Sequence, residues 1–125
     1  MSTRLKSLSV ESLKGDSLVN DVVLLGRLGQ DPELKRTAAG KEFCVLSVAT
    51  SIGKGEQKKT EWHRVEVWSA AAQTCERYLK KGARVFVRGR LKSNEWEKDG
   101  TKRKDWRVVA YDVRFLDREE GSRGR

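Results

Sequence analysis

The sequence predicts a small all-β domain that carries a single helix. Stretches rich in Val and Leu alternate with polar positions, clusters of Gly, Pro and Asp separate them, and only one stretch has helical spacing. The chain has 125 residues, a length that suits one domain with its own core. Hydrophobic residues make up 37% of the chain. A packed core is therefore expected, and global disorder is not.

Five segments are predicted to be strands: 19–29, 43–51, 61–68, 84–92 and 103–116. A turn at 29–32 and a polar loop at 33–41 separate the first two strands, and an Asp99-Gly100 hairpin signal separates the last two. Three strands, a helix and two strands make up the order of a five-stranded, partly open Greek-key barrel of the OB type.

The helix is predicted over residues 70–79, between the third and fourth strands. Ser69 is expected to be its N-cap and Gly82 its stop signal. The apolar stripe expected to face the core consists of Ala71, Cys75, Tyr78 and Leu79.

Composition argues against several classes of function. No apolar run approaches the ~20 residues of a membrane helix. Cys44, Cys75 and the single His63 cannot form a four-ligand zinc site or a disulfide framework, so both cysteines are expected to be buried and reduced. The loop at 53–60 lacks P-loop spacing, and the acidic residues around Asp99 alternate with lysines as in a solvated turn. No metal, cofactor or catalytic site is expected, and the protein is not predicted to be an enzyme.

The two ends are predicted to lie outside the domain. Residues 1–18 have no apolar segment typical of a secretory signal and are expected to form a flexible arm, whereas 117–125 form a short charged tail. The folded domain is therefore predicted over 19–116.

Basic residues interleaved with aromatic ones are the most informative pattern. The net charge is +9, from 27 Lys and Arg against 18 Asp and Glu. Alternation in 61–68 places His63, Val65 and Val67 on one face and Trp62, Arg64, Glu66 and Trp68 on the other. In 84–92, the inward positions are Val85, Val87, Gly89 and Leu91, and the outward positions are Arg84, Phe86, Arg88, Arg90 and Lys92.

This pattern predicts binding to a single nucleic-acid strand, because flat rings stack on unpaired bases and cations neutralise phosphates. The candidate stacking residues are Trp62, Trp68, Phe86 and Trp96. The candidate phosphate-binding residues are Lys35, Arg36, Lys54, Lys58, Lys59, Arg64, Lys81, Arg84, Arg88, Arg90 and Lys92. The competing interpretation places all four tryptophans in the core beneath a merely solvated basic face. Phe43, Tyr111 and Phe115 are assigned to the core, and Trp106 to neither side.

Several runs of residues resemble those of bacterial single-stranded DNA-binding proteins. They are 23–33 (VLLGRLGQDPE), 49–51 (ATS), 60–65 (TEWHRV), 78–82 (YLKKG) and 87–91 (VRGRL), and the resemblance covers 19–116. It implies an OB-fold subunit of a homotetramer that binds single-stranded DNA without strong sequence preference, in replication, recombination and repair. It also implies a cytoplasmic, nucleoid-associated location, with an organelle matrix as the alternative.

The resemblance assigns roles to individual residues. Stacking positions carry over to Trp62, Trp68 and Trp96, and His63 falls at a subunit-interface position. Phosphate positions carry over to Lys35, Arg64, Lys81 and Lys92.

The sequence departs from the family pattern in three places. Residues 52–54, just after the run at 49–51, include no aromatic where family members often have one, and about 18 residues precede the family core. The segment 121–125 (GSRGR) is basic where the family usually has an acidic tip that recruits partners. Two alternatives remain: an OB-fold adaptor or accessory protein in a replication or conjugation complex, with weak nucleic-acid binding, and an RNA-binding protein.

Overall fold

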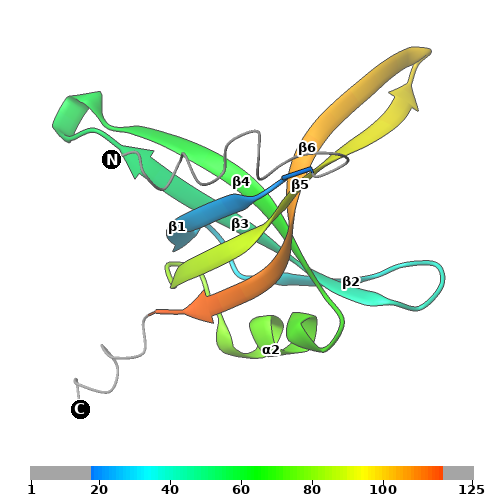
Figure 1. Ribbon diagram of the computed structural model, residues 1–125, viewed down its shortest axis with the longest axis horizontal. Coiled ribbons are helices and arrows are strands. Elements are labelled where there is room, and N and C mark those ends of the chain that lie inside the picture. Colours follow the sequence, from blue (N-terminus) through cyan, green and yellow to red (C-terminus); the bar gives the residue numbers. More distant parts are fainter. Residues whose placement is uncertain (1–17, 117–125) are drawn as a thin grey trace.

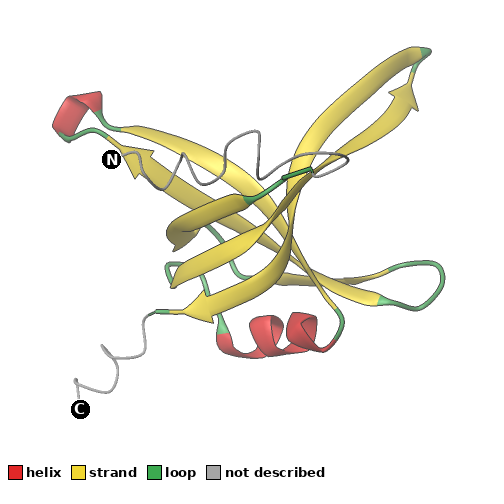
Figure 2. Cartoon of the chain, in the orientation of Figure 1, coloured by secondary structure: helices red, strands yellow, loops and turns green. Residues whose placement is uncertain are grey.

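The computed structural model describes residues 18–116. It contains strands β1 (Val22–Leu28), β2 (Glu33–Arg36), β3 (Glu42–Ile52), β4 (Lys59–Trp68), β5 (Arg84–Lys98) and β6 (Thr101–Phe115), the 3₁₀ turn η1 (Gly55–Gln57) and the helix α2 (Ala70–Tyr78) (Figures 1 and 2). The predicted tail at 117–125, and all of the predicted arm except Leu18, lie outside the described residues.

Five of the strands form a closed ring. The order around the sheet is β1-β5-β6-β4-β3, and β3 returns to pair with β1. Neighbouring strands are antiparallel except for β4 and β6, which run parallel and pair only at Val65–Val108 and Glu66–Val109. The predicted five-stranded OB barrel is confirmed, including its helix between β4 and β5.

The short strand β2 corrects the sequence prediction, which made 33–41 a polar loop. Glu33 to Arg36 pair antiparallel with Val45 to Glu42 of β3. All four β2 residues are exposed, so the segment lacks the apolar alternation by which strands are recognised. Its pairing follows from the hairpin with β3.

The core consists of the inward positions of the ring and one side of the helix. Its fully buried larger side chains are Leu46, Val48, Val65, Val85, Val87, Cys44 and Cys75. The expectation that both cysteines are buried is confirmed, and burial raises the pKa of Cys44 to about 12 and of Cys75 to about 11. Both thiols are therefore protonated at neutral pH.

Helix α2 lies across one end of the barrel (Figure 1). Its apolar stripe is shifted from the predicted one, because Ala72, Cys75 and Leu79 are buried whereas Ala71 and Tyr78 are exposed. Ser69 is not a side-chain N-cap: it has a φ of 65° and makes no side-chain capping hydrogen bond. Instead its backbone oxygen accepts a hydrogen bond from the N–H of Ala72.

Strands β5 and β6 continue beyond the barrel as a two-stranded arm (Figure 1). They pair out to Lys98–Thr101, and Asp99 and Gly100, with φ values of 54° and 77°, form the predicted tight turn. Within the barrel, the register shifts between Arg88 and Gly89, which leaves Tyr111 as an extra residue of β6. Tyr111 is consequently exposed rather than in the core as predicted.

One further core assignment differs and another agrees. Leu91, predicted to face inward, is 40% exposed because it lies where the arm leaves the barrel. Phe115 does pack against the core cluster, as expected.

None of the helices within residues 18–116 has the length and hydropathy needed to cross a membrane.

Candidate nucleic-acid interface

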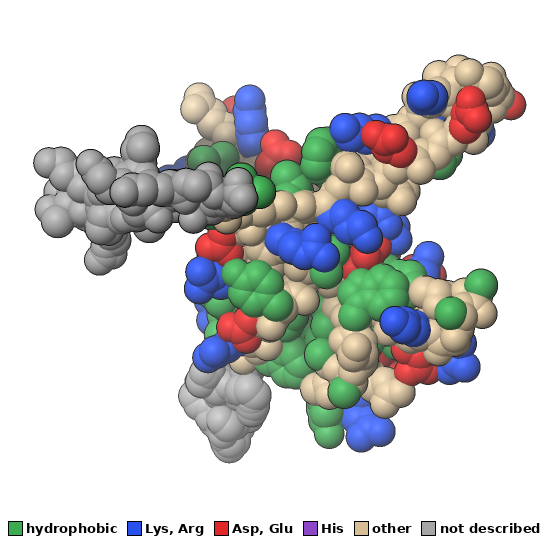
Figure 3. Space-filling view, turned by 45° about the vertical axis from the view of Figure 1, so that its right-hand side comes forward, with side chains coloured by type: hydrophobic (Ala, Val, Ile, Leu, Met, Phe, Trp, Pro, Cys, Tyr) green, Lys and Arg blue, Asp and Glu red, His purple; other side chains and the backbone are tan. Residues whose placement is uncertain are grey.

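The outward positions of β2, β3, β4, β6 and β5 form one continuous sheet surface, here called the outer face. Its register rows run from Lys35 through Phe43 to Trp68, and from Glu33 through Val45, Glu66 and Val109 to Arg90. In the space-filling view, basic side chains gather at the base of the projecting arm, beside hydrophobic groups (Figure 3). The predicted combination of cations and rings is thus present on a sheet surface.

Trp62 is the most exposed of the four tryptophans, with 60% of its surface accessible. The indole lies against Gly29, where a Cβ would come within 2.2 Å of Cζ3 and 2.6 Å of Cη2. Gly29 is itself held by a hydrogen bond from its N–H to the oxygen of Ser47, 2.9 Å long. The ring is therefore supported at its outer end while most of it stays open to solvent.

Trp68 is half-buried and stacks on Phe43, with ring centroids 4.4 Å apart and planes 18° from parallel. The assignment of Phe43 to the core is wrong, because the alternation in β3 points Cys44, Leu46 and Val48 inward and Phe43 outward. Phe43 thus belongs to the outer face and covers one side of the Trp68 indole.

Trp96 and Trp106 lie on opposite faces of the arm. Trp96 pairs with Arg103 and is 42% exposed, whereas Trp106 pairs with Ser93. Ser93 and Trp96 are three positions apart on β5, and residues an odd number of positions apart on a strand point to opposite faces. Nζ of Lys104 sits 4.9 Å from the Trp106 ring centroid. Three of the four tryptophans are exposed and the fourth is half-buried, so the interpretation that all four pack in the core is wrong.

A buried carboxylate lies between Trp62 and Trp68. Glu66 is 4% exposed, and its Oε2 lies 2.6 Å from Nη1 of Arg107 and 3.8 Å from Nη2 of Arg64. Nε1 of Trp68 donates to Oε1 of Glu66 at 3.4 Å. Arg107 also donates to Asp105 at 3.0 Å. Sequence reasoning missed Arg107 and took Glu66 for an exposed residue, because its burial depends on β6, which follows β4 only after the helix and another strand.

The charge of Arg107 reflects two opposing influences. Burial lowers the pKa of its guanidinium, but hydrogen bonds to Glu66 and Asp105 outweigh that effect and raise the pKa above its usual value. Arg107 is therefore a permanent cation inside this cluster.

Besides Arg64, two of the predicted phosphate-binding residues are engaged in ion pairs. Arg88 donates to both oxygens of Asp21, at 2.9 and 3.2 Å, and Tyr111 donates to the same carboxylate at 2.7 Å. Arg36 is ion-paired with Glu42. Arg90 and Lys92, by contrast, are exposed on the outward side of β5, on the stretch that leads to Trp96.

The other predicted residues are distributed around this face. Lys54, Lys58 and Lys59 lie at the tip of the β3–β4 hairpin, away from the arm (Figure 1). Lys81 follows α2, and its backbone N–H donates to Asp31 at 2.9 Å. Phe86 is half-buried on β5 opposite Leu25 of β1, and Arg84 pairs with Arg27. Phe86 and Arg84 are outward positions of β5, and one register row joins Arg84 to Trp62 through Arg27 and Ala49.

His63 points to the opposite side of β4 from Trp62. It is half-buried, and its Nε2 lies 2.9 Å from Oγ1 of Thr50 on β3. Neither it nor any other residue of the described chain belongs to a group of three or more His, Cys, Asp and Glu suited to hold a metal ion.

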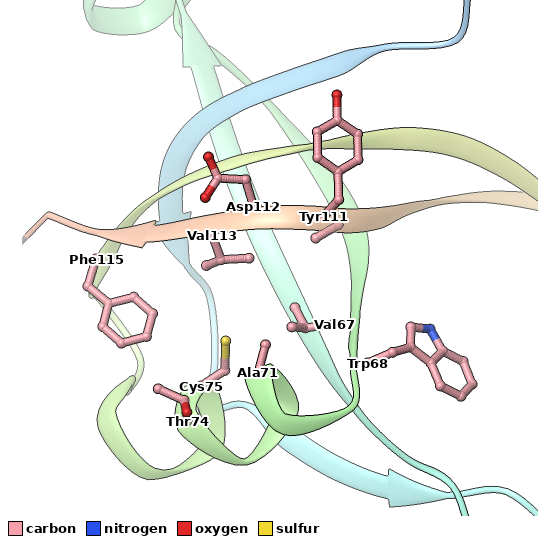
Figure 4. A pocket seen from close by; sticks show the side chains of 10 residues that line it. Val67, Trp68, Ala71, Thr74, Cys75, Tyr111, Asp112, Val113 and Phe115 are labelled. Atoms are coloured by element: carbon pink, nitrogen blue, oxygen red, sulfur yellow. The ribbon is translucent and has the colours of Figure 1, made fainter.

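A shallow groove of about 340 Å³ lies between α2 and β6. Figure 4 shows Ala71 and Cys75 of the helix facing Val113 of β6, with Trp68 and Phe115 at the two ends. The groove is largely apolar and has no cluster of charged groups, so it does not resemble the outer face.

Comparison with known proteins relates the chain to one family. Residues 19–116 match the single-strand binding protein family. The chain is 37% identical over 113 residues to single-stranded DNA-binding protein 1 of Chlorobaculum tepidum, covering 85% of this chain and 70% of that protein. It is equally similar to the single-stranded DNA-binding protein of Neisseria meningitidis, of which it covers 65%. The chain thus spans about two thirds of the length of these relatives.

A solved structure is similar over nearly all of the domain. A Plasmodium falciparum SSB, determined in complex with ssDNA, superposes with a TM-score of 0.73 and 28% sequence identity, covering 82% of this chain and 99% of that one.

Proposed function

The chain belongs to the single-strand binding protein family, and we propose that it binds single-stranded DNA without strong sequence preference. The observation that carries the proposal is the presence of exposed indoles and unburied cations on one sheet surface of an OB barrel. Duplex DNA hides the faces of its bases, so exposed rings are suited to a single strand.

The proposed mechanism divides the work between rings and cations. Bases stack on Trp62 and Trp96 and on the open side of Trp68, whereas phosphates contact Lys35, Arg64, Arg90 and Lys92. Phe86, Lys54, Lys58, Lys59, Lys81 and Arg84 would extend the path beyond the outer face. Arg36 and Arg88 contribute less, because each is hydrogen-bonded to a carboxylate, whereas Arg64 lies 3.8 Å from its carboxylate partner. Such a site binds and protects a strand and performs no catalysis.

We further propose that the protein assembles as a homotetramer, with His63 near a subunit interface. Exposed Val23 and Leu25 on β1 offer apolar surface for such contacts. A tetramer of this kind would serve DNA replication, recombination and repair, at the nucleoid in the cytoplasm. Multi-angle light scattering measures the assembly directly, and a monomer would contradict this part of the proposal.

Titration of the intrinsic tryptophan fluorescence with oligo-dT tests the binding. Strong quenching is expected, and duplex DNA should not compete for the site. The logarithm of the binding constant should fall with the logarithm of the salt concentration, with a slope of about −0.7 for each phosphate contact. Weak quenching, or equal competition by duplex, would contradict the proposal and favour an OB-fold adaptor. Oligo-U in a parallel titration would reveal a preference for RNA.

A further inference from the structure

The buried carboxylate of Glu66 is a negative charge in a surface proposed to bind an anionic strand. It lies on the outer face between Trp62 and Trp68, next to Arg64, one of the proposed phosphate contacts. A negative charge there repels phosphates, and taking it out of water is unfavourable unless it is paired. Its position therefore calls for a function that offsets both effects.

Glu66 is itself rigidly held. Arg107 reaches it from β6 at 2.6 Å, and the indole N–H of Trp68 reaches its other oxygen from two positions along β4. The side chain of Arg107 is only 13% exposed and is fixed at its other end by Asp105. A carboxylate anchored from two strands keeps one orientation.

Arg64 is more exposed than Glu66 and Arg107. Its Nη2 lies 3.8 Å from Glu66, a distance of ion pairing, and 39% of its side chain is exposed. An arginine in this state keeps its outward N–H groups available, while the fixed carboxylate limits the rotamers it visits. Restricting a long side chain before binding lowers the entropy lost when it contacts a ligand.

We propose that Glu66 is a positioning residue for single-stranded DNA, which acts by holding Arg64 toward the strand. This inference rests on the proposed binding of single-stranded DNA. Glu66 makes no contact with DNA in this mechanism, and its benefit comes from Arg64, whose guanidinium is fixed between the two tryptophans of β4.

The sign of one mutational effect separates positioning from simple charge. Glu66→Gln removes a negative charge from a basic protein, so long-range electrostatics alone would tighten DNA binding. Loss of positioning would weaken it. The expected result is about three- to tenfold weaker binding to oligo-dT at moderate salt, the cost of ordering one or two long side chains.

Glu76→Gln is the matched control. Glu76 is exposed on α2, an element that contributes nothing to the outer face. Its substitution makes the same change of charge and is expected to leave the affinity unchanged or slightly tighter. If Glu66→Gln binds as tightly as Glu76→Gln, the inference is overturned. If the unsubstituted protein does not bind oligo-dT, the proposed function itself fails.

A double-mutant cycle excludes a merely structural effect. Arg64→Gln is expected to weaken binding, and adding Glu66→Gln to it should cause little further loss, because Glu66 acts through Arg64. Losses that multiply would overturn the inference.

Arg64→Lys keeps the test decisive if Glu66→Gln fails to fold, since it leaves Glu66 and Arg107 in place. It retains the charge without the planar fork and should bind several-fold more weakly. Affinity equal to that of the unsubstituted protein would contradict the role of a positioned guanidinium.

Discussion

The indole of Trp62 rests on Gly29, and the absence of a side chain at Gly29 is what lets it lie there. A Cβ on Gly29 would come within 2.2 Å of the ring, well inside contact distance. Gly29 follows β1, whereas Trp62 belongs to β4, so the contact ties the orientation of a proposed stacking ring to the end of a distant strand.

Gly29→Ala is therefore expected to displace the ring without unfolding the barrel, since the exposed indole has room to move. Trp62→Ala should cost about 1–3 kcal/mol of single-strand affinity, and Gly29→Ala should lie between that variant and the unsubstituted protein. Fluorescence titration with oligo-dT measures both. Gly29→Ala with unchanged affinity would show that the resting position of the ring does not matter.

Arg88 and Arg90 share one side of β5 but are expected to respond differently to substitution. Arg88 is held by Asp21 and lies 5.9 Å from the Tyr111 ring centroid, so Arg88→Ala should lower the melting temperature. The same variant should change DNA affinity less than about twofold, because exposed ion pairs contribute only small free energies. Arg90→Ala should leave the melting temperature nearly unchanged but weaken DNA binding. It should also reduce the steepness of the salt dependence of that binding by about 0.7 in log–log slope. Equal losses of affinity in the two variants would contradict this division.

The Asp21–Arg88 pair also predicts an acid-sensitive contribution to stability. Hydrogen bonds from Arg88 and from Tyr111 lower the pKa of Asp21 below its ordinary value of 3.8. A lowered carboxyl pKa stabilises the fold above the unfolded-state pKa, and this contribution is lost as pH falls through the folded-state value. The difference in melting temperature between the unsubstituted protein and Asp21→Asn should thus be constant near neutral pH and shrink below about 3.8. A difference that grows on acidification would refute this assignment.

Gly89 is expected to be intolerant of substitution because two strands meet closely there. A Cβ at Gly89 would lie 2.2 Å from the backbone oxygen of Val109, which cannot move without breaking the β5–β6 ladder. Gly89→Ala should lower the free energy of unfolding by about 3 kcal/mol, the upper part of the range for overpacked sites. Urea denaturation measures the loss. Gly40→Ala is a useful comparison, since Gly40 has a φ of 91° but nothing near its Cβ position, and should cost only the backbone strain of about 1–2 kcal/mol.

The ring strands could be predicted because their inward residues alternate clearly, as Cys44, Leu46 and Val48 do in β3. Strand β2 could not, since its four exposed residues pair with β3 without contributing to the core. The error at Tyr111 has a similar origin: a bulge opposite Arg88 and Gly89 shifts the alternation, and nothing local to the sequence marks it.

The candidate interface was predictable where it depends on one strand at a time. Trp62 and Arg64 alternate within β4, so their shared face follows from strand geometry alone. The Glu66–Arg107 pair joins β4 to β6 across the parallel contact, and only the closed ring reveals it. The same holds for Phe43, whose stacking on Trp68 depends on the β3–β4 register.

The arm formed by the outer parts of β5 and β6 has a consequence for how such a protein can change. Between Val108 and the tip of the arm, these strands pair only with each other within the described chain. Trp96 lies four positions before Gly100 of the tip turn. Removing or adding two residues in each strand between the barrel and Trp96 would shift Trp96 along the arm by roughly 7 Å, and would keep it on the same face, without touching a core side chain. Evolution or design can therefore adjust the length of single-stranded DNA that the proposed interface covers, independently of the stability of the barrel.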